Sequence, residues 1–240
     1  MTASASLRVH RRVVGPLATN CYLVAAGPYA LIVDPGDDAP GLITWMQDLG
    51  VQVVGILNTH AHFDHVLALR PLKESLGIPH ALHHEEVPVL QRQRAYLLEH
   101  FGLDPGEIPA PEVLLQDGDA VYWSHGVFTV VRNGEVIWGE APPAHSPGLQ
   151  VVHTPGHSPG SVCFRGPDFA LVGDLLFEGS VGRADLRGSD PAALRRSLRR
   201  ILEDWPPGTR IYPGHGPETT LARECRHNPF LLEWFPDLCG

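Results

Sequence analysis

The sequence predicts a mixed α/β protein (α/β or α+β class) in which β-sheets carry helices on their outer faces. Short apolar or β-branched segments typical of strands alternate with helix-type segments in both halves of the chain. The 240 residues include 25 glycines and 23 prolines, which predicts many turns and short elements. Because no stretch of linker composition divides the chain, we expect a single domain over residues 1–240.

The first 57 residues predict three strands, a helix and a fourth strand. Gly-Pro pairs separate the expected strands Leu7–Val14, Asn20–Ala26 and Tyr29–Val33. A helix over Leu42–Leu49 ends at a glycine, the usual residue after a helix. The next segment, Val51–Leu57, is almost continuously apolar, as in a strand that is covered on both faces.

The following segment predicts two helices around a short strand. We expect a helix over Val66–Leu76, a strand over Ile78–Leu82, and a helical stretch over Glu85–Phe101 that breaks at Pro88. Residues 102–111 are rich in proline and glycine and predict a loop.

The second half predicts further strands and two helices. Asn133-Gly134 between β-type segments is a strong hairpin signal. Asp190-Pro191 is a typical helix start, with a capping residue before a proline in the first turn. The expected strands are Val127–Val131, Glu135–Trp138, Leu149–His153, Ser161–Arg165, Phe169–Val172 and Arg210–Tyr212, and the last helix is expected over Glu218–Arg226.

Charge and composition argue against several classes of protein. The formal net charge of −9 disfavours a surface that binds nucleic acid or anionic membrane. No apolar run approaches the roughly 20 residues of a membrane span, and the N-terminus lacks the apolar core of a secretory signal, so we expect a cytoplasmic protein. The four cysteines have no C-x-x-C spacing, and we expect them to be free, buried thiols.

Ligand-type side chains are concentrated directly after the expected strand Val51–Leu57. His60, His62, Asp64 and His65 occupy four of six consecutive positions. Residues i and i+2 of an extended segment point the same way, so His60 and His62 are placed to hold one ion. A turn after His62 directs the other two side chains toward a second position beside it. This spacing at the end of a strand predicts a metal-binding loop.

Three more ligand-type residues also follow expected strands. His157 lies in the turn after Leu149–His153, Asp174 comes after Phe169–Val172, and His215 lies in Pro213-Gly214-His215-Gly216-Pro217. All three stand beside glycine or proline at the end of a strand, so we expect them to complete the site.

These motifs resemble those of the metallo-β-lactamase-fold hydrolases, and among them the glyoxalase II (hydroxyacylglutathione hydrolase) branch. The resemblance extends over most of the chain. It rests on the histidine loop and on the segments Pro16–Val24, Val33–Asp38, Thr154–Ser161, Gly173–Phe177, Tyr212–Gly216 and Asn228–Leu231. The fold it implies is a four-layer αβ/βα sandwich, with two facing sheets, helices outside and metals at one edge.

The resemblance also implies roles for the ligand-type residues. His60, His62 and His157 would bind one metal, Asp64, His65 and His215 a second, and Asp174 would bridge the two. Seven nitrogen and oxygen ligands without cysteine suit two divalent ions, with Zn(II) favoured over Fe(II) or Mn(II). A metal-bound hydroxide held by this set, with Asp64 and Asp174 as its carboxylates, is the expected nucleophile.

A thioester suits such a site, because thiolate leaves without a strong acid donor. The expected activity is hydrolysis of an acyl thioester such as S-lactoylglutathione to a thiol and a carboxylic acid. The alternative is a sulfur (persulfide) dioxygenase with a single iron held by His60, His157 and Asp174; such enzymes resemble this chain at Gly182–Asp185. A β-lactamase is disfavoured because that branch lacks the bridging aspartate that Asp174 resembles.

The chain departs from glyoxalase II in two regions. We expect no separate C-terminal helical domain of the kind that helps to hold glutathione, and residues 121–148 are interpreted as a hairpin insertion. Arg183 and Asp185 stand where the family places substrate-side residues; Arg183 is expected either to bind a substrate carboxylate or to pair with Asp185. The cluster His80, His83 and His84, with His125 and His145, is interpreted as surface or helix-flanking histidines. The sequence does not argue for or against a homodimer.

Overall fold

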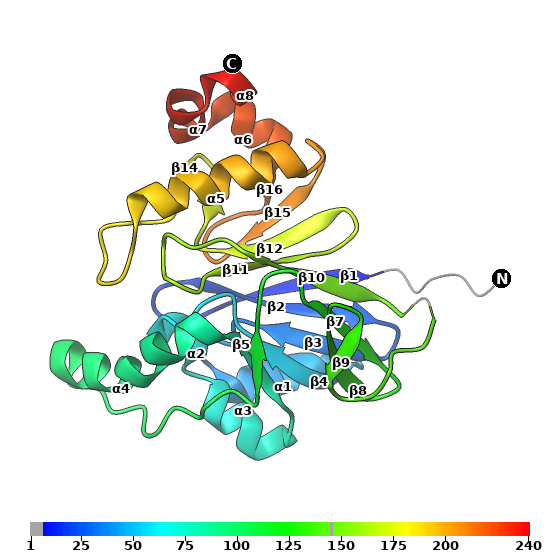
Figure 1. Cartoon of the computed structure of the whole chain (residues 1–240). Coiled ribbons are helices and arrows are strands. Elements are labelled where there is room, and N and C mark those ends of the chain that lie inside the picture. Colours follow the sequence, from blue (N-terminus) through cyan, green and yellow to red (C-terminus); the bar gives the residue numbers. More distant parts are fainter. Residues whose placement is uncertain (1–6, 145) are drawn as a thin grey trace.

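The computed structural model describes residues 7–144 and 146–240 and contains two sheets packed face to face between two layers of helices (Figure 1). One apolar core lies between the sheets and includes Val24, Leu57 and Trp123. One further core lies between each sheet and the helices that cover it. The four-layer αβ/βα sandwich expected from the sequence is therefore confirmed.

The first sheet has six strands in chain order. They are β1 (Arg8–Val14), β2 (Thr19–Ala26), β3 (Tyr29–Val33), β4 (Gln52–Leu57), β5 (His80–His83) and β6 (Val113–Leu115). The strands β1, β2 and β3 pair antiparallel, and β3 to β6 pair parallel. Parallel strands are covered on both faces, which explains the apolar sequence of β4.

The second sheet has eight strands in the order β16-β15-β12-β11-β10-β7-β8-β9. Their bounds are β7 (Ala120–Ser124), β8 (Val127–Arg132), β9 (Glu135–Trp138), β10 (Gly148–His153), β11 (Val162–Arg165), β12 (Phe169–Gly173), β15 (Arg210–Pro213) and β16 (Thr219–Thr220). Only β12 and β15 pair parallel within this sheet as described. A separate two-stranded ribbon joins β13 (Leu176–Phe177) and β14 (Ser180–Val181).

The predicted hairpin is present as β8 and β9, at the far edge of the second sheet. Its turn residues Asn133 and Gly134 have φ angles of 50° and 84°, the left-handed region that this turn chemistry favours. Strand β7 joins the hairpin to β10 and was not predicted. That residues 121–148 are an insertion stays a prediction.

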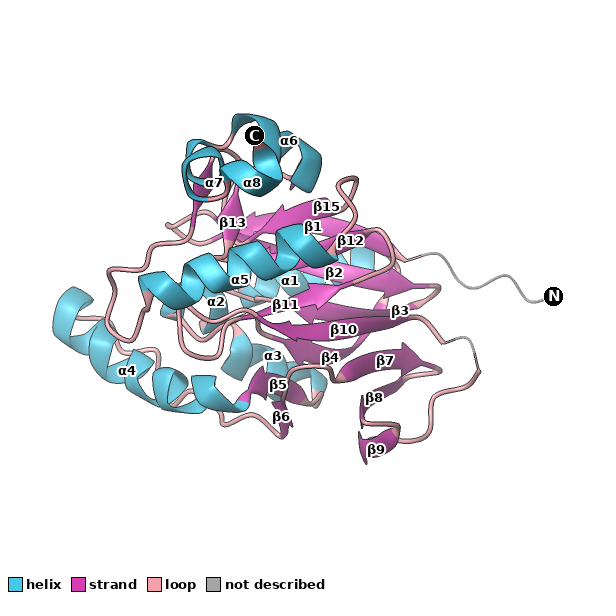
Figure 2. Ribbon diagram, turned by 45° about the horizontal axis from the view of Figure 1, so that its top comes forward, coloured by secondary structure: helices cyan, strands magenta, loops and turns pink. Residues whose placement is uncertain are grey.

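Helices cover the outer face of each sheet (Figure 2). Those of the first half are α1 (Ala39–Asp48), α2 (Phe63–Val66), α3 (Leu69–Leu76) and α4 (Val87–Phe101), preceded by the 3₁₀ turn η1 (His84–Glu86). Those of the second half are α5 (Pro191–Asp204), α6 (Leu221–His227), α7 (Pro229–Trp234) and α8 (Pro236–Cys239). Within the described residues, we find no helix with the length and apolar composition that a membrane crossing requires.

Two predicted helices in the first half differ from the structure. The helix expected over Val66–Leu76 begins only at Leu69, as α3, which places Pro71 in its first turn, where proline is tolerated; Val66 is the last residue of the separate helix α2. The break expected at Pro88 is wrong, since Pro88 also lies in a first turn and α4 runs unbroken to Phe101.

Two predictions for the C-terminal part are also corrected. Residues Thr219 and Thr220 form β16, so the last predicted helix begins at Leu221 rather than at Glu218. The expectation of four free thiols is wrong for Cys225 and Cys239, which form a disulfide where α8 folds back against α6. Cys21 and Cys163 are free and buried, as expected.

Candidate metal centre

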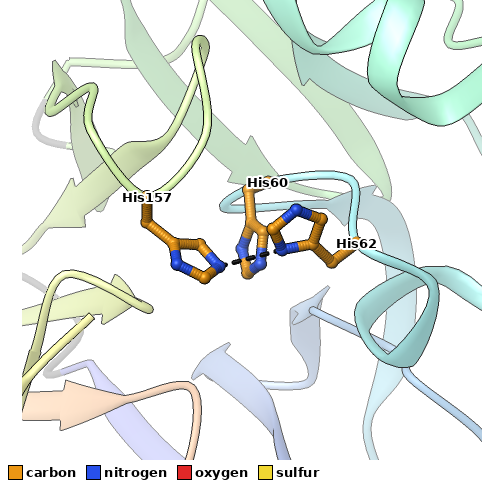
Figure 3. A group of neighbouring side chains, drawn as sticks. All are labelled: His60, His62 and His157. Atoms are coloured by element: carbon orange, nitrogen blue, oxygen red, sulfur yellow. Dashed lines mark hydrogen bonds between the residues drawn. The ribbon is translucent and has the colours of Figure 1, made fainter. Parts of the chain in front are cut away.

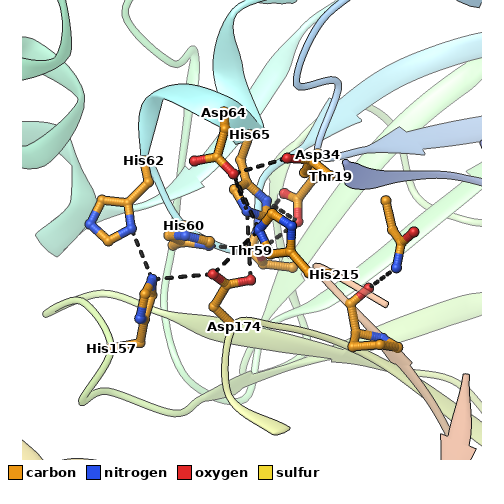
Figure 4. A network of polar contacts seen from close by, with 12 residues as sticks. Thr19, Asp34, Thr59, His60, His62, Asp64, His65, His157, Asp174 and His215 are labelled. Atoms are coloured by element: carbon orange, nitrogen blue, oxygen red, sulfur yellow. Dashed lines mark hydrogen bonds and ion pairs between the residues drawn. The ribbon is translucent and has the colours of Figure 1, made fainter. Parts of the chain in front are cut away.

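All seven residues predicted as metal ligands lie together at one edge of the two sheets (Figure 4). Four of them follow β4 at the carboxyl end of a strand of the first sheet: His60 and His62 lie in the loop after β4, and Asp64 and His65 lie in the short helix α2. The other three come from the second sheet, where His157, Asp174 and His215 follow β10, β12 and β15. The centre is therefore assembled from both halves of the sandwich.

The first group consists of His60, His62 and His157 (Figure 3). One ring nitrogen of each lies within 4.8 Å of the other two. The Nδ1 atom of His62 lies 2.8 Å from Nε2 of His157, so two loops that are distant in sequence meet at this point. Three neutral imidazole nitrogens in this arrangement can hold a zinc-type ion.

The second group consists of Asp64, His65 and His215, whose ligand atoms also lie within 4.8 Å of one another. The Oδ2 atom of Asp64 lies 3.2 Å from Nε2 of His215 and 3.4 Å from Nε2 of His65. Thr19 Oγ1 donates a 2.9 Å hydrogen bond to the same oxygen, which fixes the carboxylate.

Asp174 lies between the two groups. Its Oδ1 atom is 3.6 Å from Nε2 of His65, and its Oδ2 atom is 3.4 Å from Nε2 of His157. A single carboxylate therefore reaches both groups. Gly214 is required beside it, because a Cβ atom at that position would lie 2.2 Å from Asp174 Oδ1.

The ring nitrogens on the far side of four histidines are held by other groups. Such contacts fix the ring orientation and the tautomer, as in known metal sites. The pairs are His60 with Thr59 Oγ1 (3.1 Å), His65 with Asp34 Oδ2 (3.1 Å), His157 with the carbonyl of Arg183 (2.8 Å) and His215 with the carbonyl of Leu17 (3.1 Å). Each of these four histidines thus presents Nε2 to the centre.

Several polar atoms that face the centre are buried without a hydrogen bond inside the described chain. They are Nε2 of His60, Nε2 of His65 and Oδ1 of Asp174. Buried polar atoms are normally satisfied, so atoms of this kind that converge on one point fit a bound cation. The donor set and these unsatisfied atoms therefore suit divalent metal ions.

The electrostatics divide the histidines into two kinds. Burial, together with neighbouring His157 and His65, lowers the pKa of His62 to about 3. Burial would also lower the pKa of His65, but the carboxylates of Asp64, Asp34 and Asp174 outweigh it and raise this pKa to about 10. His62 is therefore neutral and ready to bind metal at pH 7, whereas His65 must release a proton when it does so.

Glu86 links the loop that carries His60 and His62 to the loop that carries His157. Its side chain is completely buried, and its two oxygens accept hydrogen bonds from the backbone N–H groups of Ala61 (2.8 Å) and Gly160 (2.7 Å). Ala61 stands between two ligands of the first sheet's loop, and Gly160 follows His157 in the other loop. Because burial disfavours the charged form, the pKa of this carboxyl is raised.

A cleft of about 690 Å³ opens onto the centre. Helix α4 and the segment after β14 form its walls, and His62, Asp64, His157, Asp174 and His215 lie at its base. One wall is aromatic: the ring of Phe63 lies 6.0 Å from that of Tyr96 and 5.6 Å from that of Phe101.

Arg183 and Asp185, the predicted substrate contacts, form an exposed ion pair with each other. Two hydrogen bonds of 2.9 and 3.0 Å join the guanidinium to the carboxylate. Arg183 also lines the cleft, and its backbone carbonyl holds His157. The pair that the sequence offered as one alternative is present, and the role of Arg183 toward a substrate stays a prediction.

The other histidines are placed differently from the prediction. His80 and His83 are not surface residues, because both are buried in β5, although His83 does flank a helical turn as the N-cap of η1. His84 lies in η1 and is partly exposed, and His125 is exposed in the turn before β8. His145 lies outside the described residues.

Comparison with known proteins is consistent with this geometry. Residues 14–215 match the family model described as the Metallo-beta-lactamase superfamily. The probable metallo-hydrolase YqgX of Bacillus subtilis is 34% identical over 227 residues, 94% of this chain and 98% of that protein. The hydroxyacylglutathione hydrolase GloC of Haemophilus influenzae is 31% identical over 204 residues, 84% of this chain and 87% of that protein.

Two solved structures are similar over almost their whole length. TTHA1623 in a di-iron-bound form is 42% identical, with a TM-score of 0.77, and the match covers 92% of this chain and 100% of that chain. The B3 metallo-beta-lactamase BLEG-1 is 33% identical, with a TM-score of 0.77 and coverage of 93% and 99%.

Proposed function

Because the chain belongs to the metallo-beta-lactamase superfamily, we propose that it is a metal-dependent hydrolase of glyoxalase II type whose substrate is a small acyl thioester. The observation that carries the proposal is Asp174, which reaches both groups of ligand atoms. The similarity to GloC of Haemophilus influenzae, a hydroxyacylglutathione hydrolase, supports the thioester class and S-lactoylglutathione as its first representative.

Each group of ligands would hold one divalent ion. His60, His62 and His157 would hold the first, Asp64, His65 and His215 the second, and Asp174 would contribute an oxygen to each. Two bound ions would lower the pKa of a shared water toward about 7, which makes hydroxide available at neutral pH. Zinc is the ion we propose; the di-iron form of TTHA1623 makes iron the first alternative.

The chain's own residues orient the ligands and shape the substrate site. Asp34, Leu17 and Arg183 hold the far ring nitrogens of three ligand histidines, so these rings need no reorientation. The aromatic wall of Phe63, Tyr96 and Phe101 gives one side of the cleft an apolar surface for the substrate. A thioester in this cleft would place its carbonyl at the ligand atoms on the floor and its thiol part toward the open mouth.

The test is hydrolysis of S-lactoylglutathione by protein that has been reloaded with zinc, iron or manganese. We expect metal-dependent release of glutathione, and a set of acyl thioesters with different thiols then defines the carrier. A protein that holds two ions per chain but hydrolyses none of these thioesters would contradict the proposal. A single iron with oxygen uptake on glutathione persulfide would favour the dioxygenase instead.

One comparison favours a second activity that belongs in the same experiment. BLEG-1, a B3 metallo-beta-lactamase, is 33% identical over nearly its whole chain. A chromogenic cephalosporin therefore serves as a further substrate. Turnover of the cephalosporin without turnover of any thioester would replace the proposed function by β-lactam hydrolysis.

A further inference from the structure

A second group of metal-ligating side chains lies outside the metal centre described above. It consists of His83 at the end of β5, Glu85 in η1 and His153 at the end of β10. One ligand atom of each lies within 4.8 Å of the other two. The rings of His83 and His153 stack with their centroids 4.2 Å apart, and Nε2 of His153 lies 3.7 Å from Oε2 of Glu85.

The group combines a buried histidine with ligands that solvent can reach. His83 is 2% exposed, whereas the side chains of His153 and Glu85 are 22% and 47% exposed.

The charges around the group do not oppose a cation. Arg132 and Arg200, the nearby guanidinium groups, are each paired with a carboxylate: Arg132 with Asp119 at 2.8 Å, and Arg200 with Asp117 at 3.1 Å. His84 adds a fourth ligand-type side chain, with Nε2 3.9 Å from Oε1 of Glu85. The Glu85 carboxylate and the imidazole rings of His83, His84 and His153 remain to meet an incoming ion.

We propose that His83, Glu85 and His153 form a peripheral site for one divalent transition-metal ion of zinc type, separate from the catalytic centre. Two imidazoles and a carboxylate are ligands that Zn²⁺ and Co²⁺ accept. In a tetrahedral zinc site the ligand atoms lie about 3.4 Å apart, given metal–ligand distances near 2.1 Å. The Glu85–His153 pair is already close to this spacing, and the half-exposed Glu85 side chain is free to turn toward the ion. An imidazole nitrogen binds metal in the plane of its ring, so the partly exposed His153 ring must also turn out of its stack on His83.

An ion at this position would link the two sheets of the sandwich. His83 belongs to the first sheet and His153 to the second. In the structure, Nε2 of His153 lies 3.0 Å from the carbonyl oxygen of Pro159, so metal coordination through Nε2 would replace that hydrogen bond. The expected consequence is greater thermal stability, because an ion that binds only the folded state stabilises it.

The experiment uses protein whose catalytic centre has first been filled to two equivalents. Zinc alone is then titrated by calorimetry, cobalt is titrated by absorption spectroscopy, and bound metal is counted by elemental analysis. We expect a third equivalent and a higher midpoint of thermal unfolding. The variants Glu85→Gln and His153→Gln should weaken only this equivalent, by more than about tenfold, since even partners outside the coordination sphere are worth 10–100-fold.

The controls separate this site from the catalytic centre. His227→Gln changes an exposed histidine in the last turn of α6 and should leave all three equivalents in place. His62→Ala should weaken binding at the centre and keep the peripheral equivalent. Absence of a third equivalent in the wild-type protein, or its persistence in the double variant Glu85→Gln/His153→Gln, would overturn the proposal. Activity is not the readout, so a failure of the proposed hydrolase function would leave this result intact.

Discussion

The two halves of the candidate metal centre are built differently. The first sheet contributes one short segment, the loop after β4 with His60 and His62 and the helix α2 with Asp64 and His65. The second sheet contributes single residues after three separate strands. A local loop can position its ligands by its own backbone, whereas the three distant ligands depend on the packing of the whole second sheet against the first. The contacts between the halves should therefore also affect how tightly the centre binds metal.

Asp174→Ala tests the contribution of the second sheet most directly, because Asp174 is the residue from that sheet that reaches both groups of ligand atoms. We expect turnover to fall by more than about 1,000-fold, since metal-ion catalysis supplies several kcal/mol and each 1.36 kcal/mol is a factor of ten. The midpoint of thermal unfolding of the metal-free protein should change little, because the side chain is removed without disturbing a core. His62→Ala, on the other half, should lose activity to a similar extent. Normal turnover in either variant would contradict a dinuclear site.

Glu86→Gln tests the connection between the halves without touching a ligand. A glutamine keeps one acceptor oxygen, but its NH₂ group would face the N–H of Ala61 or Gly160 and leave a buried donor unpaired, at a cost of about 1–3 kcal/mol. We expect zinc affinity at the His60, His62 and His157 group to fall by about 10–100-fold, measured by competition with a chelator.

Glu85→Gln is the matched control, because Glu85 is the adjacent residue and is half exposed. It should leave the affinity of the catalytic group unchanged. If Glu86→Gln and Glu85→Gln bind the first two equivalents equally well, Glu86 does not hold the two loops in register.

Asp34→Asn tests whether a residue outside the ligand set orients His65, on the side of the first sheet. Asp34 Oδ2 lies 3.1 Å from Nδ1 of His65, which places the proton on Nδ1 and leaves Nε2 free for a metal. An asparagine that presents its NH₂ group there would reverse the tautomer. We expect the ion held by Asp64, His65 and His215 to bind about 10–100-fold more weakly, so that elemental analysis finds closer to one ion than two. Asp48→Asn, at an exposed position of α1, should keep two, and an unchanged stoichiometry in Asp34→Asn would argue against this role.

The sequence predicts the parts of the site that are local in the chain and misses those that arise from packing. The histidine loop is visible because its spacing is a property of six residues, and the other three ligands are visible because each ends a strand and matches a family motif. In the sequence, Asp34 stands out only as part of such a motif, and no motif singles out Glu86. Glu86 is 25 residues from Ala61, and the parallel pairing of β4 and β5 helps to bring their segments together. Likewise, His83 meets His153 only because the two sheets face each other.

The same reasoning explains the errors in secondary structure. The sequence around Pro88 does not show whether this proline breaks a helix or lies in the first turn of one. In the structure, η1 ends at Glu86, so α4 begins at Val87 and Pro88 lies in its first turn. The strands β6 and β16 have only three and two residues, and they form because neighbouring strands offer them hydrogen bonds. Cys225 and Cys239 are joined because α6, α7 and α8 fold back on one another, which no spacing motif announces.

The smallest expected effect concerns Arg183 and Asp185 at the mouth of the cleft. If the guanidinium binds a carboxylate of the substrate, Asp185 competes with the substrate for it. Arg183→Gln should then raise KM, and Asp185→Asn should lower it. Each change should be about three- to fivefold with kcat unchanged, because exposed ion pairs are worth at most about 1 kcal/mol. A pair that only stabilises the loop would move KM in the same direction in both variants, because either substitution removes the same two hydrogen bonds. Steady-state kinetics with S-lactoylglutathione and with a thioester that lacks carboxylates distinguishes the two roles, since only the charged substrate should show the opposite shifts.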